Sequence, residues 1–262
     1  MYFYPMKSIA LIGYGNLGQH LHTAVKPMDA YAITQICSPT QQTGLRDGIF
    51  YATSAELLKP ADLYIIAVKD DAIQDVSQQL PQDAFVIHTS GAQPLSVLSR
   101  QPKAGVLYPL QSFSKDAPIN FHEVPLFIEA KNEQELVVVN DLAAHLSKRV
   151  SVLNSEGRFQ LHLTGVIVNN FVNHLYCQAS ALLKDQQLPF DLLHPLITET
   201  ARKALNMDPH EAQTGPAKRK DLKTIQAHLA VLTDENQREI YKLLSRSISA
   251  YDKKTIDFGE EL

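Results

Sequence analysis

The sequence predicts an α/β domain over residues 1–153 followed by an all-α domain over residues 154–262. Three observations carry this prediction. Short β-type runs alternate with helix-like stretches in the first part, long helical patterns fill the second, and the prolines divide in the same way. Ten of the 14 prolines lie at or before Pro125, and none occurs from 126 to 188. A length of 262 residues suits two domains, and 45% hydrophobic with 20% charged residues suits a chain that buries a core.

Strands are predicted in the first part wherever β-type residues run between turn residues. Strands that alternate with helices form βαβ units, so we expect a parallel sheet. The predicted strands are Ser8–Ile12, Tyr31–Cys37, Leu63–Val68, Phe85–His88, Ala104–Tyr108, Leu126–Ile128 and Val150–Leu153. The predicted helices are Asn16–Val25, Ser54–Leu58, Ala72–Gln79 and Glu133–Leu146.

Long helices are predicted from Glu156 onward. The stretch from Phe159 to about Lys184 holds no proline and fits one helix of about 26 residues, about 39 Å long at 1.5 Å per residue. Apolar residues then repeat at helical spacing in three further stretches. These are Asp191–Leu205, Leu222–Leu232 behind a cap at Asp221, and Asn236–Tyr251.

Composition and charge exclude several classes of function. The 24 basic and 28 acidic residues give a formal charge of 24 − 28 = −4, which argues against a general nucleic-acid binder. Two cysteines form neither a disulfide framework nor a zinc site of paired cysteines, and no metal site is predicted. No window approaches 18 uninterrupted apolar residues, and Met1–Ile12 lacks the pattern of a signal peptide. We therefore expect a cytoplasmic protein that binds neither membrane nor nucleic acid.

A cluster of glycines follows the first predicted strand. The chain has only 11 glycines, yet three of them fall within the six residues GYGNLG, between an apolar strand and a helix. In such a turn the first glycine permits the tight bend, the second lets the backbone approach a pyrophosphate, and the third lets helix and strand pack closely. A tight turn without a ligand is the weaker interpretation. The predicted dinucleotide-binding residues are Gly13, Tyr14, Gly15, Asn16, Leu17 and Gly18.

The end of the second strand bears on the choice of cofactor. An acidic residue there would bind the ribose 2′-hydroxyl of NAD, but this segment, which contains Ser38, Pro39 and Thr40, has none. Hydroxyl and amide donors suit a 2′-phosphate better, and Arg46 is near enough in the sequence to reach back. NADP is therefore favoured over NAD, with Ser38, Pro39 and Thr40 as binding residues. An ordinary Ser-Pro turn is the alternative.

Two further strand ends carry polar residues at the sheet edge where ligands of parallel sheets bind. Val68 and Lys69 are predicted to contact the cofactor, although Lys69 fits a turn before a helix cap equally well. Ser90 is predicted to hydrogen-bond the substrate or the nicotinamide amide, and His88 to exchange protons. A lone histidine at a strand end is more often structural, which is the alternative for His88.

A polar stripe follows one face of the long predicted helix. Its members, at spacings of 3, 4, 4 and 3, are His162, Gly165, Asn169, Asn173 and Tyr176. A buried amide needs hydrogen-bond partners, so two asparagines on one face indicate either a ligand or a packing or dimer interface. The pattern does not decide between these two interpretations.

Several motifs together resemble a known family. GYGNLG, AVKDDAI, HTSGA, YPLQSFS, VNNF and TGPAKRKD are similar to those of NADP oxidoreductases that pair a Rossmann-like domain with a helical domain of unknown function. That family falls in the 6-phosphogluconate dehydrogenase-like superfamily, with pyrroline-5-carboxylate reductases and deazaflavin-dependent NADP reductases as wider relatives. The resemblance covers nearly the whole chain. It implies hydride transfer to or from a small molecule bound between the two domains, and a homodimer through the C-terminal helices.

One position departs from the β-hydroxyacid dehydrogenases of that superfamily. They carry Gly-x-x-x-Lys-x-x-x-Asn on the first long helix, where the lysine transfers a proton, whereas the matching residues here are Gly165, Asn169 and Asn173. An amide orients a carbonyl or amine but is no general acid near pH 7. We predict an NADP-dependent oxidoreductase with Ser90, Asn169, Asn173 and His88 as candidate catalytic residues. A non-catalytic NADP(H)-binding sensor or interaction protein on the same scaffold is the alternative.

Overall fold

The computed structural model describes residues 6–250 of the chain. The chain forms two compact units, Met1–Phe171 and Val172–Leu262. The last strand, β9 (Val150–Val152), and the helix α4 (Ser155–Gly165) flank the predicted domain boundary between residues 153 and 154. The division into compact units falls later, where the π-helical segment η5 (Val166–Phe171) passes into α5 (Val172–Asp185).

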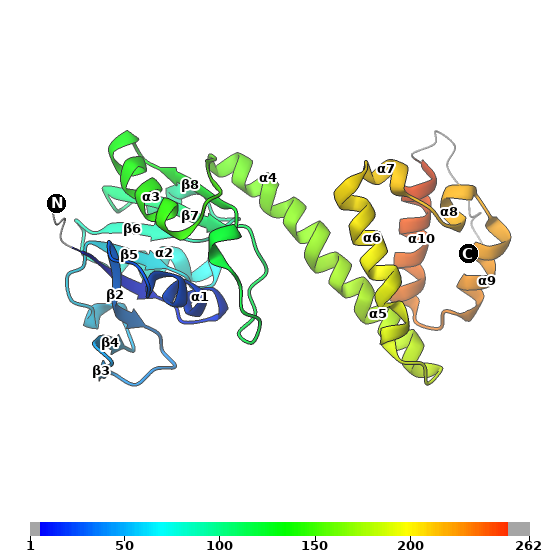
Figure 1. Cartoon of the computed structure of the whole chain (residues 1–262), viewed down its shortest axis with the longest axis horizontal. Coiled ribbons are helices and arrows are strands. Elements are labelled where there is room, and N and C mark those ends of the chain that lie inside the picture. Colours follow the sequence, from blue (N-terminus) through cyan, green and yellow to red (C-terminus); the bar gives the residue numbers. More distant parts are fainter. Residues whose placement is uncertain (1–5, 251–262) are drawn as a thin grey trace. The chain divides into compact units, whose positions relative to one another are not determined.

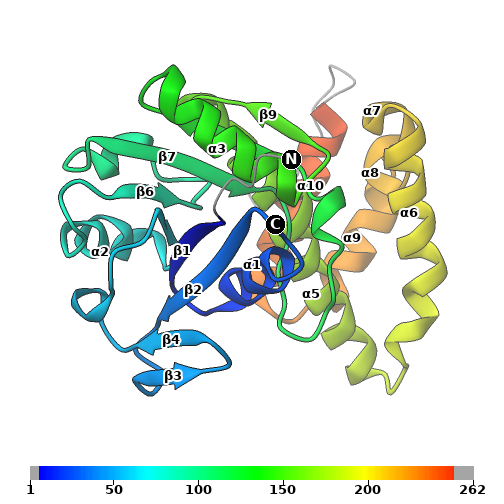
Figure 2. The ribbon, with the colours of Figure 1, turned by 60° about the vertical axis from the view of Figure 1, so that its left-hand side comes forward.

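Within the described residues, the first unit contains a sheet of nine strands in the order β3-β4-β2-β1-β5-β6-β7-β8-β9 (Figures 1 and 2). β1 pairs in parallel with β2 and β5, so that Ile12 lies opposite Cys37 on one side and Ile66 on the other. Parallel pairing continues through β6 to β7, and the carboxyl ends of these strands therefore share one edge. The remaining bounds are β1 (Lys7–Ile12), β2 (Tyr31–Cys37), β3 (Gly44–Arg46), β4 (Ile49–Ala52), β5 (Leu63–Ile66), β6 (Phe85–His88), β7 (Lys103–Pro109) and β8 (Leu126–Ala130).

Two departures from the predicted parallel sheet have identifiable causes. β8 runs antiparallel to β7. The connection between them holds only the short η4 (Phe121–Glu123), and no helix carries the chain back for a parallel return. The prediction also lacks the antiparallel hairpin β3–β4. Its turn, Asp47–Gly48, has φ values of 51° and 78°, which suits a type I′ turn and the Asp-Gly dipeptide that favours it.

Helices cover both faces of the sheet, as a largely parallel sheet requires (Figure 2). Leu21 of α1 (Asn16–Val25) and Val139 of α3 (Glu133–Leu146) join the apolar cluster on one face. Ile73 of α2 (Ile73–Gln78) joins the cluster on the other face. The observed bounds of α1 and α3 are the predicted ones, because each has a clear helical pattern and, for α3, a side-chain cap from Asn132. The short 3₁₀ segments are η1 (Ala55–Leu57), η2 (Asp70–Ala72), η3 (Leu95–Leu98) and η6 (Phe190–Leu193).

The described part of the second unit is helical, which confirms the predicted fold class of an α/β domain followed by an all-α domain. Asp221 caps α9 as predicted, with its carboxylate accepting a hydrogen bond from the Thr224 N–H at 3.1 Å. Tyr251, predicted as the end of the last helix, lies outside the described residues. No helix among residues 6–250 is long and apolar enough to cross a membrane. The helices after α5 are α6 (His194–Asn206), α7 (Pro209–Ala212), α8 (Pro216–Arg219), α9 (Leu222–Val231) and α10 (Glu235–Ala250).

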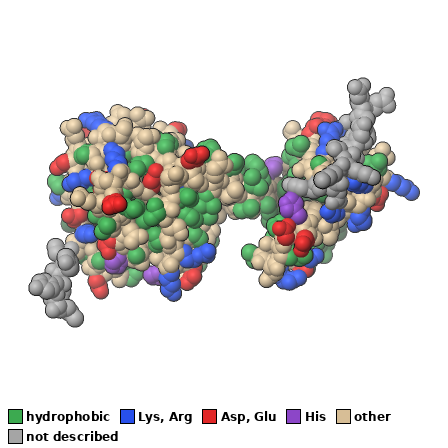
Figure 3. Space-filling view, turned by 90° about the horizontal axis from the view of Figure 1, so that it is seen from above, with side chains coloured by type: hydrophobic (Ala, Val, Ile, Leu, Met, Phe, Trp, Pro, Cys, Tyr) green, Lys and Arg blue, Asp and Glu red, His purple; other side chains and the backbone are tan. Residues whose placement is uncertain are grey.

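Large apolar side chains remain exposed on the helices of the second unit. Leu196 and Leu205 of α6 are 65% and 85% exposed, and Leu243 of α10 is 65% exposed. The apolar stripe predicted for α10 is thus only partly covered within the chain. Hydrophobic side chains also gather over the helical segment α4–η5 (Figure 3). The buried side chains of α10 are instead Lys242, Ser245 and Ser249.

Candidate functional site

The turn between β1 and α1 is built on close backbone contacts. Gly13 has a φ of 100°, which residues with side chains rarely adopt, and a Cβ there would collide with the carbonyl oxygen of Ala67 after β5. A Cβ at Gly18 would collide with the carbonyl oxygen of Gly13, so Gly18 allows α1 to pack against the strand. The fold of the turn itself therefore requires both of these glycines.

Gly15 differs because the space beside it is open. Apart from the adjoining residues of the chain, no atom of the described residues lies within 4 Å of a Cβ built there, and its φ of −76° is accessible to any residue. Gly15 is also the N-cap of α1 and offers no side chain to the first N–H groups of the helix. An anion beside Gly15 would meet those N–H groups and the positive end of the helix dipole. The fold does not require a glycine here, whereas a bound pyrophosphate would.

The segment after β2 carries hydroxyl groups next to a guanidinium group. The hydroxyl oxygens of Ser38 and Thr40 are 3.0 Å apart. Arg46 of β3 donates to Oε1 of Gln41 at 3.2 Å and to the carbonyl oxygen of Gln42 at 3.0 Å. The β3–β4 hairpin thus brings positive charge to a segment without an acidic residue, an arrangement that suits a phosphate.

The predicted cofactor segments lie together at the carboxyl edge of the sheet. The Gly13 N–H donates to the carbonyl oxygen of Cys37 at 2.8 Å, which joins the glycine turn to the end of β2. The nitrogen of Val68 lies 3.0 Å from the Cβ position of Gly13, and Lys69 follows as an exposed residue. Residues 13–18, 38–40 and 68–69 are therefore neighbours in space, although they are far apart in the sequence.

His88 and Ser90 hold the loop after β6. His88 is fully buried, and its Nδ1 accepts a hydrogen bond from the Ser90 N–H at 3.2 Å. Burial and the nearby charge of Arg158 lower the pKa of His88 to about 3, so the imidazole is neutral near pH 7. Oγ of Ser90 accepts from the Ala92 and Gln93 N–H groups at 3.1 and 3.0 Å. This geometry does not support the predicted proton exchange by His88, because the ring meets no solvent and stays uncharged.

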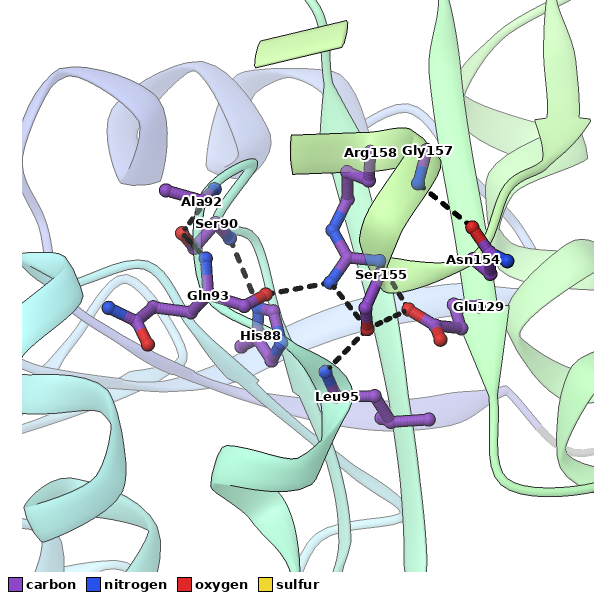
Figure 4. A network of polar contacts seen from close by, with 10 residues as sticks. All are labelled: His88, Ser90, Ala92, Gln93, Leu95, Glu129, Asn154, Ser155, Gly157 and Arg158. Atoms are coloured by element: carbon purple, nitrogen blue, oxygen red, sulfur yellow. Dashed lines mark hydrogen bonds and ion pairs between the residues drawn. The ribbon is translucent and has the colours of Figure 1, made fainter. Parts of the chain in front are cut away.

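Arg158 of α4 anchors the helix to this loop through a network that the sequence did not indicate (Figure 4). Its guanidinium forms an ion pair with Glu129 of β8 and donates to the carbonyl oxygen of Gln93 at 2.7 Å. Oγ of Ser155 donates to Glu129 at 2.8 Å and accepts from the Leu95 N–H at 2.9 Å. The Arg158 side chain is 1% exposed, so the network fixes the start of α4 against β8 and the loop after β6.

A tyrosine–histidine pair lies where α4 passes the end of β7. The Tyr108 hydroxyl and Nδ1 of His162 are 3.2 Å apart, and the two rings meet edge to face with centroids 6.0 Å apart. Tyr108 is 8% exposed, while His162 is only partly buried. Both residues line a cavity of about 320 Å³, a size that accommodates a small organic molecule. The other residues that line it are Leu110, Gln111, Ser112, Thr164, Gly165, Val166, Val168, Asn169 and Asn170.

Gly91 allows this pair to form. A Cβ at Gly91 would lie 2.6 Å from Cζ of Tyr108 and 2.8 Å from Nδ1 of His162. A side chain at this position would therefore push apart the loop, the phenol ring and the imidazole. The glycine of the HTSGA motif thus brings three segments together, the loop after β6, the end of β7 and α4.

The π-helical segment η5 alters the predicted polar stripe. A π-helix has wider turns than an α-helix, so spacings of 3, 4, 4 and 3 do not keep one face through Val166–Phe171. Asn169 lines the cavity together with its neighbour Asn170. Asn173 does not line it and belongs to α5 in the second unit. The uniform helix predicted from Phe159 to Lys184 is thus interrupted where its polar residues lie.

The cavity is lined by hydrogen-bonding and apolar groups. No Asp, Glu, Lys or Arg side chain is among its lining residues. The described residues also contain no group of three or more His, Cys, Asp or Glu side chains arranged to hold a metal ion. The sequence drew attention to Tyr108 as a strand end and to His162 as the start of the stripe, but their pairing joins residues 54 positions apart.

The chain matches known proteins over both parts. A family model described as a domain of unknown function, DUF2520, matches residues 124–248. No curated protein matches the chain. A reductive aminase from Aspergillus terreus, solved in complex with NADPH and ethyl levulinate, is 14% identical with a TM-score of 0.63, and the match covers 95% of each chain. Pyrroline carboxylate reductase from Plasmodium falciparum, solved with NADP bound, is 14% identical with a TM-score of 0.54, covering 93% of this chain and 98% of that one. These two matches show the shared fold.

A third solved structure is more similar. It is a putative NADP oxidoreductase from Bacteroides fragilis, 38% identical to this chain with a TM-score of 0.84. The match covers 93% of this chain and 98% of the Bacteroides protein. Identity at this level over nearly the full length of both chains, together with the glycine turn and the helical second part, shows common descent. The chain therefore belongs to this family of putative NADP oxidoreductases, in which the DUF2520 model spans the last strands of the sheet and most of the helical part.

Proposed function

We propose that the protein is an NADP-dependent oxidoreductase that transfers a hydride between the nicotinamide and an uncharged small molecule. The observation that carries the proposal is the contrast within the glycine turn. Gly13 and Gly18 meet protein atoms, whereas the space beside Gly15 is open at the N-terminus of α1. That open space is where a pyrophosphate would bind. Membership in a family of NADP oxidoreductases supports the same conclusion.

Separate segments would hold the two ends of the cofactor. The turn Gly13–Gly18, with Val68 and Lys69 beside it, would bind the pyrophosphate. Ser38, Pro39 and Thr40, together with Arg46 bonded to the following residues Gln41 and Gln42, would bind the 2′-phosphate. When bound, the cofactor supplies or accepts the hydride, and the protein supplies position and electrostatics. The Aspergillus and Plasmodium proteins were solved with NADPH or NADP, which is consistent with this choice of cofactor.

The reactive end is proposed to lie at the cavity beside Tyr108. Asn169 lines this cavity, and its amide would orient a carbonyl or imine through hydrogen bonds. Ser90 belongs to the loop that contacts Tyr108 and His162 through Gly91. Asn173 stays a candidate from the sequence pattern. No Lys or Arg side chain lines the cavity to pair with a carboxylate, which favours an uncharged substrate.

Cofactor binding is tested by titrating NADPH and NADH and following the emission of the reduced nicotinamide, which no tryptophan of this chain disturbs. We expect NADPH to bind more tightly than NADH. Gly15→Ala should weaken NADPH binding at least about tenfold, or ~1.4 kcal/mol, because its methyl group occupies the pyrophosphate position. The melting temperature of that variant should fall only slightly, because its Cβ lies in open space and alanine is merely a poorer N-cap than glycine.

Gly13→Ala is the matched contrast, because it adds the same methyl group where the fold has no room. It should lower the melting temperature as well as binding. Absence of NADPH binding to the wild-type protein at sub-millimolar concentrations would overturn the proposal. Binding without reduction of any carbonyl compound or imine would favour a non-catalytic sensor.

A further inference from the structure

The chain has no lysine at the helix position that transfers a proton in β-hydroxyacid dehydrogenases, so reduction of a carbonyl group needs another proton donor. The cavity offers one pair of groups able to transfer a proton. Tyr108 and His162 are the only residues lining it, among those described, whose side chains titrate. Their hydroxyl and Nδ1 atoms are 3.2 Å apart, within hydrogen-bond distance.

Tyr108 and His162 lie in surroundings that suit the transfer of a proton from solvent to the cavity. Tyr108 is buried at the end of β7 and faces the cavity, while His162 is partly exposed and can exchange protons with water. Burial raises the pKa of Tyr108, the charge of Asp70 raises it further, and the charge of Arg158 opposes both. The phenol therefore keeps its proton near neutral pH. Glu129 pairs with Arg158 and so offsets part of that positive charge.

The absence of a side chain at Gly91 is a second, independent observation. A Cβ there would lie within 3 Å of both Tyr108 and His162. The loop after β6 therefore leaves room for one particular arrangement of the phenol and the imidazole. Arg158 lies four residues, about one helical turn, before His162 on α4. It donates to the carbonyl oxygen of Gln93 in the same loop, which holds α4, and with it His162, in place against the loop (Figure 4).

We propose that Tyr108 and His162 form the proton-transfer pair of this oxidoreductase, acting on an uncharged ketone or imine in the cavity, an inference that rests on the proposed function. In the direction of reduction, bound NADPH would supply the hydride that the carbonyl carbon takes up. The O–H bond of Tyr108 breaks as its proton passes to the carbonyl oxygen, and the phenolate oxygen takes the proton on Nδ1 of the His162 imidazolium. Water returns one proton to His162 between turnovers. The sum is ketone plus NADPH plus one proton giving alcohol plus NADP⁺.

The test uses two acceptors of similar size that differ in their need for a proton. Reduction of 1-tetralone requires both a hydride and a proton, whereas reduction of the N-methyl-3,4-dihydroisoquinolinium ion requires only a hydride. Tyr108→Phe should lower kcat for the ketone by about 100-fold or more, the usual contribution of a general acid. The same variant should reduce the iminium ion within about threefold of the wild-type rate, because that reaction involves no proton transfer.

His162→Asn should act in the same way, lowering kcat for the ketone and leaving the iminium rate near the wild-type value. The iminium rate should be independent of pH in every variant. NADPH affinity should stay at the wild-type value in both variants. Without cofactor, the NMR resonances of the His162 ring should shift in Tyr108→Phe, which reports the hydrogen bond independently of turnover.

A matched control exists in the second unit. The Tyr241 hydroxyl lies 2.7 Å from Nδ1 of His228, and neither residue lines the cavity. Tyr241→Phe therefore removes the same kind of contact and should leave both rates unchanged. Equal loss of both reactions in Tyr108→Phe, or no loss of either, would overturn the proton-transfer assignment and leave the proposed function standing. A wild-type protein that binds NADPH but reduces neither acceptor would overturn the proposed function itself.

Discussion

Arg46 shows how one residue can bias the choice between two cofactors. Its guanidinium lies 3.9 Å from the centroid of the Tyr51 ring and donates two hydrogen bonds to the segment 41–42. These contacts hold the guanidinium against the segment that follows Ser38 and Thr40 in the chain. A positioned guanidinium loses little conformational entropy when it binds a phosphate, because the fork geometry is already set.

Replacing Arg46 by Ala should therefore weaken NADPH binding and leave NADH binding unchanged, since only NADPH carries the 2′-phosphate. A hydrogen bond to a charged group contributes about 1.5–3 kcal/mol, so we expect a loss of about 10–100-fold in NADPH affinity. Titration of both cofactors measures the effect. Arg100→Ala is the control, because Arg100 bonds the carbonyl oxygen of Gln78 away from this segment. Equal weakening of NADPH and NADH in Arg46→Ala would contradict a role in 2′-phosphate binding.

At the scale of secondary-structure elements, the contact between α4 and the loop after β6 determines the shape of the cavity. A Cβ at Gly91 would collide with both the Tyr108 ring of β7 and the His162 ring of α4. The Arg158 network holds the same helix to the same loop. The cavity lies along this helix, between Tyr108 and the π-helical segment. Its shape therefore depends on how closely α4 approaches the loop.

Gly91→Ala should consequently destabilise the first unit by about 1–3 kcal/mol, the usual cost of overpacking a filled site. Urea unfolding followed by circular dichroism measures the loss. Gly165→Ala is the matched control on the same cavity, because its Cβ would meet only Leu110 Cδ1, at the ordinary distance of 3.4 Å. Alanine is also favoured over glycine within a helix by up to ~1 kcal/mol, so Gly165→Ala should not destabilise the protein. A Gly91→Ala protein as stable as the wild type would contradict the described contact.

At the scale of the whole molecule, the second unit leaves apolar surface uncovered. Leu192, Leu196 and Leu205 are each more than half exposed, while α5 and α6 have no buried residue at all among those described. Exposed apolar side chains in contiguous helices are typical of surfaces that a partner covers. We propose that a second copy of the chain is this partner, in line with the homodimer that the resemblance implies.

Leu196→Arg should shift the protein from dimer to monomer, because the introduced charge would have to be buried at the interface. The side chain is 65% exposed in the single chain, so the substitution should not prevent folding. Sedimentation equilibrium measures the mass. Val137→Arg, at a 69% exposed position on α3, controls for the addition of charge and should leave the mass unchanged. A wild-type protein that sediments as a monomer would exclude the proposed dimer.

The glycine turn of the first unit was predictable because the residues that form it are close together in the sequence. A phosphate-binding turn needs glycines at fixed offsets between a strand and a helix, and all of them fall within residues 13–18. Most strands and helices of the first unit lie where their apolar patterns predict them. The hairpin β3–β4 was missed although Asp47–Gly48 signals it, and the antiparallel β8 was missed because strand direction depends on a connection with little pattern of its own.

The sequence by itself determined the fold class, the glycine turn and the absence of an acid after β2. Tertiary structure alone decided which polar residues meet. Tyr108 and His162 are 54 positions apart, and Arg158 reaches Gln93 across 65. Only the tertiary structure shows that His88 is buried and that a π-helical segment interrupts the polar stripe. The physical reason is that burial and pairing depend on how separate elements pack, whereas spacing along the chain reports only the conformation of one element at a time.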